Sequence, residues 1–88
     1  MARYELQFKP SVAKDLRGVP RADVGRILAR IGSLADDPRP PGAEKLSAQE
    51  RYRIRQGSYR ILYTISDAAL IVEVVQIGHH RDVYRDPK

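Results

Sequence analysis

The chain has 88 residues, a net charge of +5 and an isoelectric point near 9.9, so we expect residues 1–88 to form a single domain with a modest core. It contains no cysteine, which excludes disulfides and cysteine nucleophiles, and it has no apolar run typical of a secretion signal or a membrane span, so a cytoplasmic protein is expected. Twelve of its sixteen basic residues are arginine, whose planar guanidinium binds phosphate oxygens in pairs, and this favours a nucleic-acid partner over a membrane.

The first part of the chain predicts a strand followed by two helices. Residues 3–9 alternate apolar and polar side chains, as a half-buried strand does. Ser11 suits the N-cap of a short helix that ends at Gly18, and Pro20 suits the first turn of a second helix. Apolar residues at helical spacing predict that the second helix packs one face on the core. These residues are Val24, Ile27, Leu28, Ile31, Leu34 and Ala35.

The second part of the chain predicts three consecutive strands, at residues 51–56, 59–65 and 70–77. Apolar residues here recur with a period of two, and Gly57 occupies the position where a two-residue type II′ turn requires glycine. This turn sets Arg55 opposite Arg60. The resulting β-α-α-β-β-β order predicts an α+β domain, with both helices packed on one face of a mostly antiparallel sheet.

The sheet face away from the helices is expected to carry concentrated positive charge, from Arg53, Arg55 and Arg60. Alternation places Leu62, Ile71, Val75 and Ile77 beside these arginines, on the same face. The helix-packed face receives Tyr52, Ile54, Ile61, Tyr63, Ile65, Leu70, Val72 and Val74. Like charges directly opposite each other in a strand pair are destabilising, so a bound phosphate would compensate the repulsion. The alternative is a solvated face without a ligand, partly neutralised by Glu73.

The C-terminal segment contains both histidines, His79 and His80, which makes it a candidate for acid–base chemistry. Histidine titrates near neutral pH and is a frequent general acid or base. Neighbouring residues of an extended segment point to opposite sides, so at most one of the two faces the arginines. A metal site is not expected, because two adjacent histidines do not converge and no third ligand lies near them in the sequence.

Taken together, these segments resemble the RelE branch of the RelE/ParE toxin superfamily. The likeness rests on Lys45-Leu46, on the Arg-x-Arg and Gly-x-Tyr-Arg patterns within residues 52–63, and on residues 77–85 with their Gly-His and Arg-x-Val-Tyr patterns. The resemblance implies a microbial-ribonuclease-like toxin fold and ribosome-dependent cleavage of mRNA. In that reaction the 2′-hydroxyl of the substrate attacks the adjacent phosphate, and neither a metal nor a cofactor is needed.

The same resemblance implies roles for particular residues. Arg53 and Arg55 match a basic pair on the first hairpin strand, and Arg60 matches the arginine that stabilises the phosphorane. Tyr84 matches a tyrosine that stacks on or orients the base. The remaining residues of the expected RNA-binding set are Lys45, Arg51 and Arg85.

The general acid and the general base are less sharply assigned. His80 falls where other members carry the arginine that protonates the leaving group, and Arg81 follows directly. A catalytic histidine would produce a titration near neutral pH, whereas an arginine stays protonated. Glu44 is a candidate general base through its likeness to a glutamate of the YoeB branch.

Two other functions are compatible with this sequence: inhibition of DNA gyrase, as in the ParE branch, and a non-catalytic module that binds an antitoxin. The arginine pair together with Arg60 and Tyr84 favours cleavage. The expected partners are the ribosome with its mRNA and a cognate antitoxin, with a heterotetramer as one arrangement. An acidic, amphipathic antitoxin segment would cover either the apolar residues beside the basic face or the second helix, where Gly25 and Gly32 permit close approach.

Overall fold

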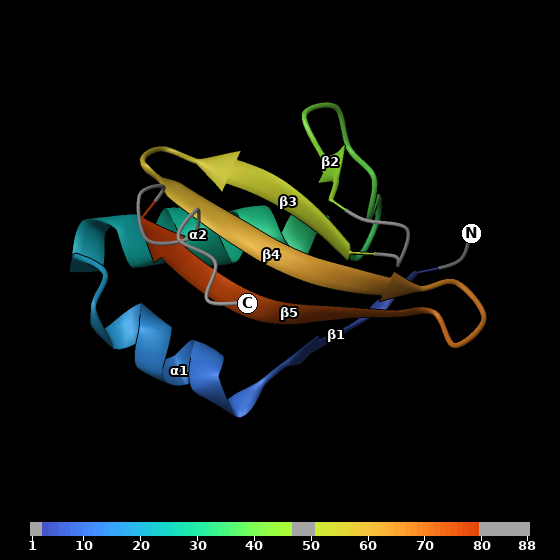
Figure 1. Ribbon diagram of the computed structural model, residues 1–88, viewed down its shortest axis with the longest axis horizontal. Coiled ribbons are helices and arrows are strands. Elements are labelled where there is room, and N and C mark those ends of the chain that lie inside the picture. Colours follow the sequence, from blue (N-terminus) through green and yellow to red (C-terminus); the bar gives the residue numbers. More distant parts are fainter. Residues whose placement is uncertain (1–2, 47–50, 80–88) are drawn as a thin grey trace.

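The fold is that of a computed structural model, which describes residues 3–46 and 51–79. The elements, in chain order, are β1 (Glu5–Phe8), α1 (Pro10–Arg17), α2 (Arg21–Ser33), β2 (Glu44–Lys45), β3 (Arg51–Gln56), β4 (Tyr59–Ser66) and β5 (Ile71–His79). Figure 1 shows them along the chain, with the three long strands side by side. The predicted order is confirmed, and the two-residue strand β2 is an addition to it.

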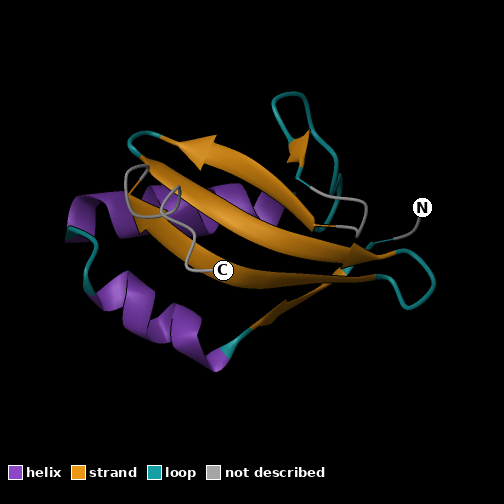
Figure 2. Ribbon diagram, in the orientation of Figure 1, coloured by secondary structure: helices purple, strands orange, loops and turns teal. Residues whose placement is uncertain are grey.

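The described strands form one sheet in the order β1-β5-β4-β3-β2. Strands β1 and β5 pair in parallel, and the other neighbouring pairs are antiparallel. In Figure 2, α2 passes behind β3 and β4 while α1 lies beside β5. The prediction of two helices packed on a mostly antiparallel sheet is therefore confirmed.

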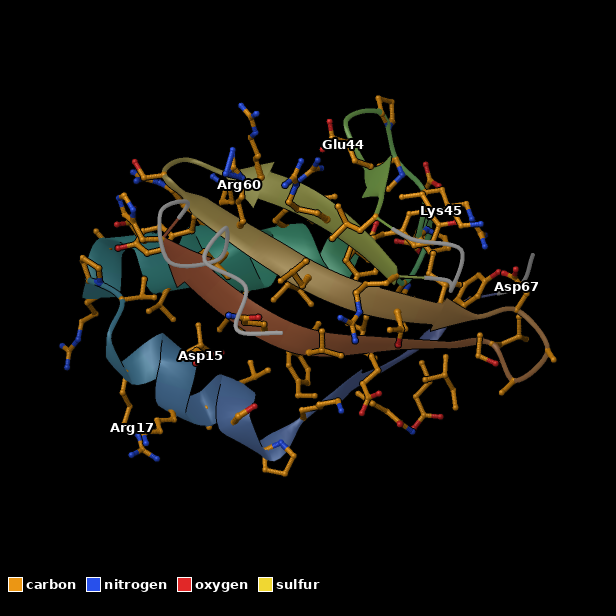
Figure 3. All side chains as sticks on the ribbon, viewed as in Figure 1. Asp15, Arg17, Glu44, Lys45, Arg60 and Asp67 are labelled. Atoms are coloured by element: carbon orange, nitrogen blue, oxygen red, sulfur yellow. The ribbon has the colours of Figure 1, made fainter. Side chains whose placement is uncertain are left out.

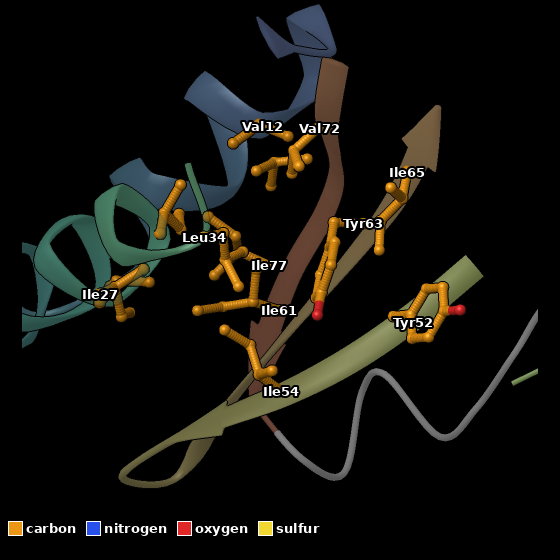
Figure 4. Close-up of a cluster of buried hydrophobic side chains, with 13 residues drawn as sticks. Val12, Ile27, Leu34, Tyr52, Ile54, Ile61, Tyr63, Ile65, Val72 and Ile77 are labelled. Atoms are coloured by element: carbon orange, nitrogen blue, oxygen red, sulfur yellow. The ribbon is translucent and has the colours of Figure 1, made fainter. Parts of the chain in front are cut away.

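The core lies between the helices and one face of the sheet (Figure 4). Both helices contribute to it, and burial of each large apolar side chain stabilises the fold by about 1.5–3 kcal/mol. Its most completely buried members are Val12, Ile27, Ile31, Leu34, Ile54, Ile61, Tyr63, Val72 and Val74. Two predicted core residues are instead on the surface. Leu28 is 43% exposed, and Leu70 is 38% exposed because it sits in the β4–β5 turn with a φ of 56°.

The start of α1 differs from the prediction. The helix begins at Pro10, the preceding Lys9 is its cap residue, and no side chain caps it. Ser11 is therefore not the N-cap. Proline is suited to the first helical position because its missing N–H would have no partner there. Gly18 does end the helix, as expected.

A bulge in β5 reverses the predicted orientation of Ile77. Leu62 pairs with Gln76 while Tyr63 pairs with Val74, so Val75 is an extra residue without a cross-strand partner in β4. One extra residue shifts the alternation of all later side chains to the other face. Ile77 consequently points into the core with 3% exposure, and its predicted place on the arginine face is wrong.

The loop between α2 and β2 is anchored to the sheet by Arg39. Its guanidinium donates hydrogen bonds to both carboxylate oxygens of Asp67, at 3.2 and 3.0 Å, and to the hydroxyl of Tyr52 at 3.0 Å. Tyr4 donates a further hydrogen bond of 2.6 Å to Asp67. The Arg39 and Tyr4 hydrogen bonds lower the pKa of Asp67, because both stabilise its ionised form. These contacts fix the loop that leads into β2.

Candidate functional site

The arginine face is the side of the sheet turned away from the core. The register pairs Arg55 with Arg60 and Arg53 with Leu62, as the hairpin pattern predicts. Gly57 has a φ of 61°, which the first central residue of a type II′ turn requires. Strand alternation adds Arg51 to the same face, so four arginines from β3 and β4 share one surface. Arg51 and Arg55 are exposed and available to solvent anions.

Arg60 is the most buried of these four residues. Its exposed fraction is 6%, and its Nε and Nη1 atoms are almost completely shielded from solvent. A guanidinium stays protonated in proteins, so this is a fixed positive charge. Its field acts over a short distance with little screening by water, and a phosphate beside it would feel it more strongly than the field of an exposed arginine. Figure 3 shows Arg60 at the β3–β4 hairpin.

Glu44 lies on the arginine face because β2 pairs with β3. The register sets Glu44 directly opposite Arg53, and the Arg53 Nη2 atom forms an ion pair with the Glu44 carboxylate. The Arg53 side chain is 13% exposed, whereas that of Glu44 is 59% exposed. The carboxylate therefore neutralises one arginine of the face and remains accessible from solvent.

Lys45 is not brought to the arginine face. It pairs with Tyr52, whose side chain is buried in the core cluster on the other side of the sheet. Successive residues of a strand point to opposite faces, so Lys45 points to the face opposite to that of Glu44. Of the predicted RNA-binding residues, Arg51, Arg53 and Arg55 share the face with Arg60.

His79 also lies on the side away from the arginines. It pairs with Tyr59, and the two rings meet edge to face with their centroids 5.7 Å apart. The neighbouring pair places Gly78 opposite Arg60. Four other predicted site residues lie outside the described part of the chain: His80, Arg81, Tyr84 and Arg85.

Asp15 contacts the end of β5 next to Gly78, and this contact was not predicted from the sequence. Its carboxylate Oδ2 atom accepts a hydrogen bond of 3.1 Å from the backbone N–H of Ile77, next to Gly78. The two residues are separated by 62 positions, and a single aspartate on a helix carries no local signal for such a contact.

No helix among residues 3–46 and 51–79 has the length and hydrophobicity needed to span a membrane. Within the same residues, no three histidine, cysteine or acidic side chains gather in a way that could hold a metal ion. By register, the arginine face of the described residues carries its four arginines together with the carboxylates of Glu44 and Glu73.

Comparison with known proteins identifies the family. Residues 6–84 match the family model described as ParE toxin of type II toxin-antitoxin system, parDE. The chain is a toxin of the RelE/ParE family. This toxin is 30% identical over 88 residues to toxin RelG of Mycobacterium tuberculosis, a match that covers 93% of this chain and 97% of RelG. It is 27% identical over 86 residues to a RelE-like toxin protein of Escherichia coli, covering 93% and 90% of the two chains.

Solved structures of RelE toxins share the fold of this toxin. A RelBE toxin–antitoxin complex from Mycobacterium tuberculosis matches with a TM-score of 0.78 and 23% identity, covering 89% of this chain and 99% of the other. A mutant of the E. coli toxin RelE, in complex with an antitoxin RelBc peptide, matches with a TM-score of 0.75 and 26% identity, covering 97% and 93%. The predicted α+β toxin fold and the resemblance to RelE are confirmed.

Proposed function

We propose that this toxin is an endoribonuclease that cleaves mRNA on the ribosome. The observation that carries the proposal is Arg60, a buried and permanently charged guanidinium set directly opposite the exposed Arg55. Two arginines in this arrangement repel each other, so the face gains most from an anion that both can contact. A phosphodiester supplies that anion, and its charge increases in the pentavalent transition state. This site therefore matches the charge that develops during cleavage of RNA.

The reaction transfers a proton at each end of the phosphate. A base takes the proton of the 2′-hydroxyl, the O2′ atom forms a bond to phosphorus, and the bond from phosphorus to O5′ breaks. An acid then donates a proton to O5′, which leaves a 2′,3′-cyclic phosphate and a free 5′-hydroxyl. We assign Arg60 to the phosphorane oxygens, His80 or Arg81 to protonation of O5′, and Tyr84 to positioning of the base.

Glu44 is the candidate base that shares the face with Arg60. Its carboxylate is solvent-accessible and paired with Arg53, and this ion pair would hold the carboxylate in place to accept the 2′-hydroxyl proton. Protonation of Glu44 would break its ion pair with Arg53 and so increase the positive charge of the face beside the phosphate. Base catalysis and phosphate binding would in this way be coupled in one step.

Substrate positioning falls mainly to the exposed cations. Arg51 and Arg55 contact solvent and would bind the phosphates on either side of the scissile bond, with Arg85 as a further candidate from the C-terminal segment. Lys45 points to the other side of the sheet by register, and we propose a contact between it and a more distant part of the ribosomal RNA. A ribosomal substrate implies a cytoplasmic location.

An antitoxin is the second proposed partner, since matching structures are of RelE toxins bound to RelB antitoxins. The surface beside the arginines is less suited to it than expected, because Leu62 and Ile77 are buried. A groove across α1 and the end of β1 is better suited. Its lining is almost entirely apolar and comprises Phe8, Lys9, Pro10, Val12, Ala13, Leu16 and Leu28. Phe8 and Leu28 are 44% and 43% exposed there, and an amphipathic acidic segment would cover both and pair with Lys9.

Inhibition of DNA gyrase is a second candidate function, because the matching family model carries the ParE name. Gyrase inhibition requires no cleavage chemistry, so it gives no reason for a buried guanidinium opposite a second arginine. A module that only binds an antitoxin gives none either. The two activities differ in their product, which is cut mRNA on stalled ribosomes in one case and damaged DNA in the other.

The experiment that tests the proposal is cleavage of mRNA on programmed ribosomes by wild type and Arg60→Ala. We expect the single-turnover rate to fall by about 10²–10³, the loss typical of one donor to a transition-state oxyanion, while ribosome binding weakens much less. Arg26→Ala is the matched control. It removes an exposed arginine from α2, which packs on the sheet face opposite to the arginine face, so this variant should cleave like wild type. Intact mRNA with wild-type protein, together with DNA damage in cells, would support gyrase inhibition instead.

A further inference from the structure

The C-terminal half of β5 has a helix, and not a strand, along one of its edges. Strand β1 pairs with β5 across residues Ile71 to Val74 and then ends, where the chain turns into α1. Strand β5 continues to His79, and α1 packs beside it. The backbone N–H of Ile77 therefore points toward a helix. Among the described residues, no carbonyl of a neighbouring strand is available there to accept its hydrogen bond.

Asp15 supplies the acceptor for this N–H. It projects from α1 toward β5 (Figure 3), and its Oδ2 atom lies 3.1 Å from the Ile77 nitrogen. A hydrogen bond to a charged carboxylate is stronger than one between neutral groups. The contact lies two residues beyond the bulged Val75 and one residue before Gly78, which pairs with Arg60.

The bulge decides which side chains lie beside Arg60. In the observed register Gly78 is opposite Arg60, and Ile77 is opposite Ile61 in the core. Without the bulge, the pairing after Leu62 would shift by one residue and bring Ile77 opposite Arg60. An isoleucine side chain would then lie next to the guanidinium, at the position where Gly78 has no side chain. The bulge is thus the reason that a residue without a side chain lies opposite Arg60.

We propose that Asp15 is a positioning residue that holds β5 in this bulged register and so keeps Gly78, rather than Ile77, opposite Arg60. The catalytic part of the inference rests on the proposed RNA cleavage. Core packing of Ile77 favours the same register. Two features weaken it: Gly78 has more backbone conformational freedom than other residues, and this half of β5 has no neighbouring strand on the α1 side within the described part of the chain. The Asp15 carboxylate provides the backbone contact that a strand would otherwise make.

The test compares Asp15→Ala and Asp15→Asn with the matched control Asp23→Ala, which removes a carboxylate from α2 that is paired with Arg26. Amide hydrogen exchange reports the Ile77 N–H, and the ring-current shift of His79 against Tyr59 reports the register. In Asp15→Ala we expect amide exchange at Ile77 to become about tenfold faster, as loss of one charged hydrogen bond implies. We expect the single-turnover cleavage rate to become about tenfold slower. Ribosome affinity should change less than about twofold, because the exposed arginines that dominate it are untouched.

Asp15→Asn keeps an oxygen acceptor and should restore most of the cleavage rate and the slow exchange. An Asp15→Ala protein that cleaves like wild type, or an Asp23→Ala protein impaired as much as Asp15→Ala, overturns the inference. So does a failure of Asp15→Asn to recover. If wild type itself does not cleave mRNA on ribosomes, both the proposed function and the catalytic part of this inference are wrong. The exchange and ring-current data then decide whether Asp15 holds the register.

Discussion

At the scale of single residues, Tyr63 links the sheet to the loop that precedes β2. Its side chain is fully buried, and its hydroxyl donates a hydrogen bond of 2.7 Å to the carbonyl of Pro38. Burial raises the pKa of Tyr63 from 10.0 to about 12, since the phenolate would lose its hydration in the core. The folded state therefore holds this proton more tightly than the unfolded state. The corresponding stability is present below pH 10 and is lost as the pH rises toward about 12.

Replacing Tyr63 with phenylalanine tests both parts of this account. At neutral pH we expect Tyr63→Phe to lower the free energy of unfolding by about 0.5–1.5 kcal/mol, the net worth of one hydrogen bond. Wild type should then lose this advantage between pH 10 and about 12, because only wild type carries the titrating phenol. Urea unfolding of both proteins across that range measures the difference. A difference that stays constant with pH would contradict the burial of the hydroxyl.

At the scale of elements, the β3–β4 hairpin divides its arginines into two kinds. Arg55 is exposed, while Arg53 is paired with Glu44 and only 13% exposed. Binding of RNA releases counterions from its phosphates in proportion to the number of free cations that contact them. Glu44 already neutralises Arg53, so the two arginines should contribute unequally to the salt dependence of binding.

The salt dependence of ribosome binding tests this division. We expect Arg55→Ala to reduce the slope of log affinity against log salt by about 0.7, as for one phosphate contact on a single strand. Arg53→Ala should reduce the slope by less, and the double variant should resemble Arg55→Ala. Equal effects of the two single variants would mean that phosphate displaces Glu44 from Arg53 in the complex. An unchanged slope in the double variant would mean that the hairpin face does not contact RNA.

At the scale of the whole molecule, the arginine face and the apolar groove use different layers of the fold. The arginines lie on the sheet face away from the core, and the groove is lined by α1, the end of β1 and Leu28 of α2. The molecule measures 34 Å in its longest dimension, so an antitoxin segment seated in the groove would have only a short way to reach the arginines. Neutralisation would then combine an apolar anchor on the helices with a cover over the basic face.

Leu28→Asp separates the groove from the cleavage site. A charge at this exposed position should weaken antitoxin binding by tenfold or more, which corresponds to about 1.4 kcal/mol, and should leave cleavage by the free toxin unchanged. Leu70→Asp is the matched control, because Leu70 is similarly exposed in the β4–β5 turn and aspartate tolerates its positive φ. Titration of the toxin with its antitoxin in a cleavage assay measures the effect. Equal weakening by both variants would place the antitoxin elsewhere.

Much of the architecture could be predicted from local patterns in the chain. The alternation of residues 51–56 and 59–65 around Gly57 was enough to predict the pairing of Arg55 with Arg60, because turn geometry and strand period together define a hairpin register. The helical stripe of α2 likewise placed Ile27 and Ile31 in the core. These features depend on residues close together in sequence, and the chain carries that information directly.

The remaining features required contacts between distant segments. The bulge that turns Ile77 into the core is marked in the sequence only by a break in alternation, since strict alternation from Val74 would bury the polar Gln76 and expose Ile77. The register itself depends on how β4 and α1 pack against β5. The pairing of Arg53 with Glu44 required the short strand β2, which two residues cannot signal, and the Asp15 contact joins residues 62 positions apart. Side-chain packing and hydrogen bonding across the fold, rather than any local preference, place the carboxylates and the glycine that surround the arginines.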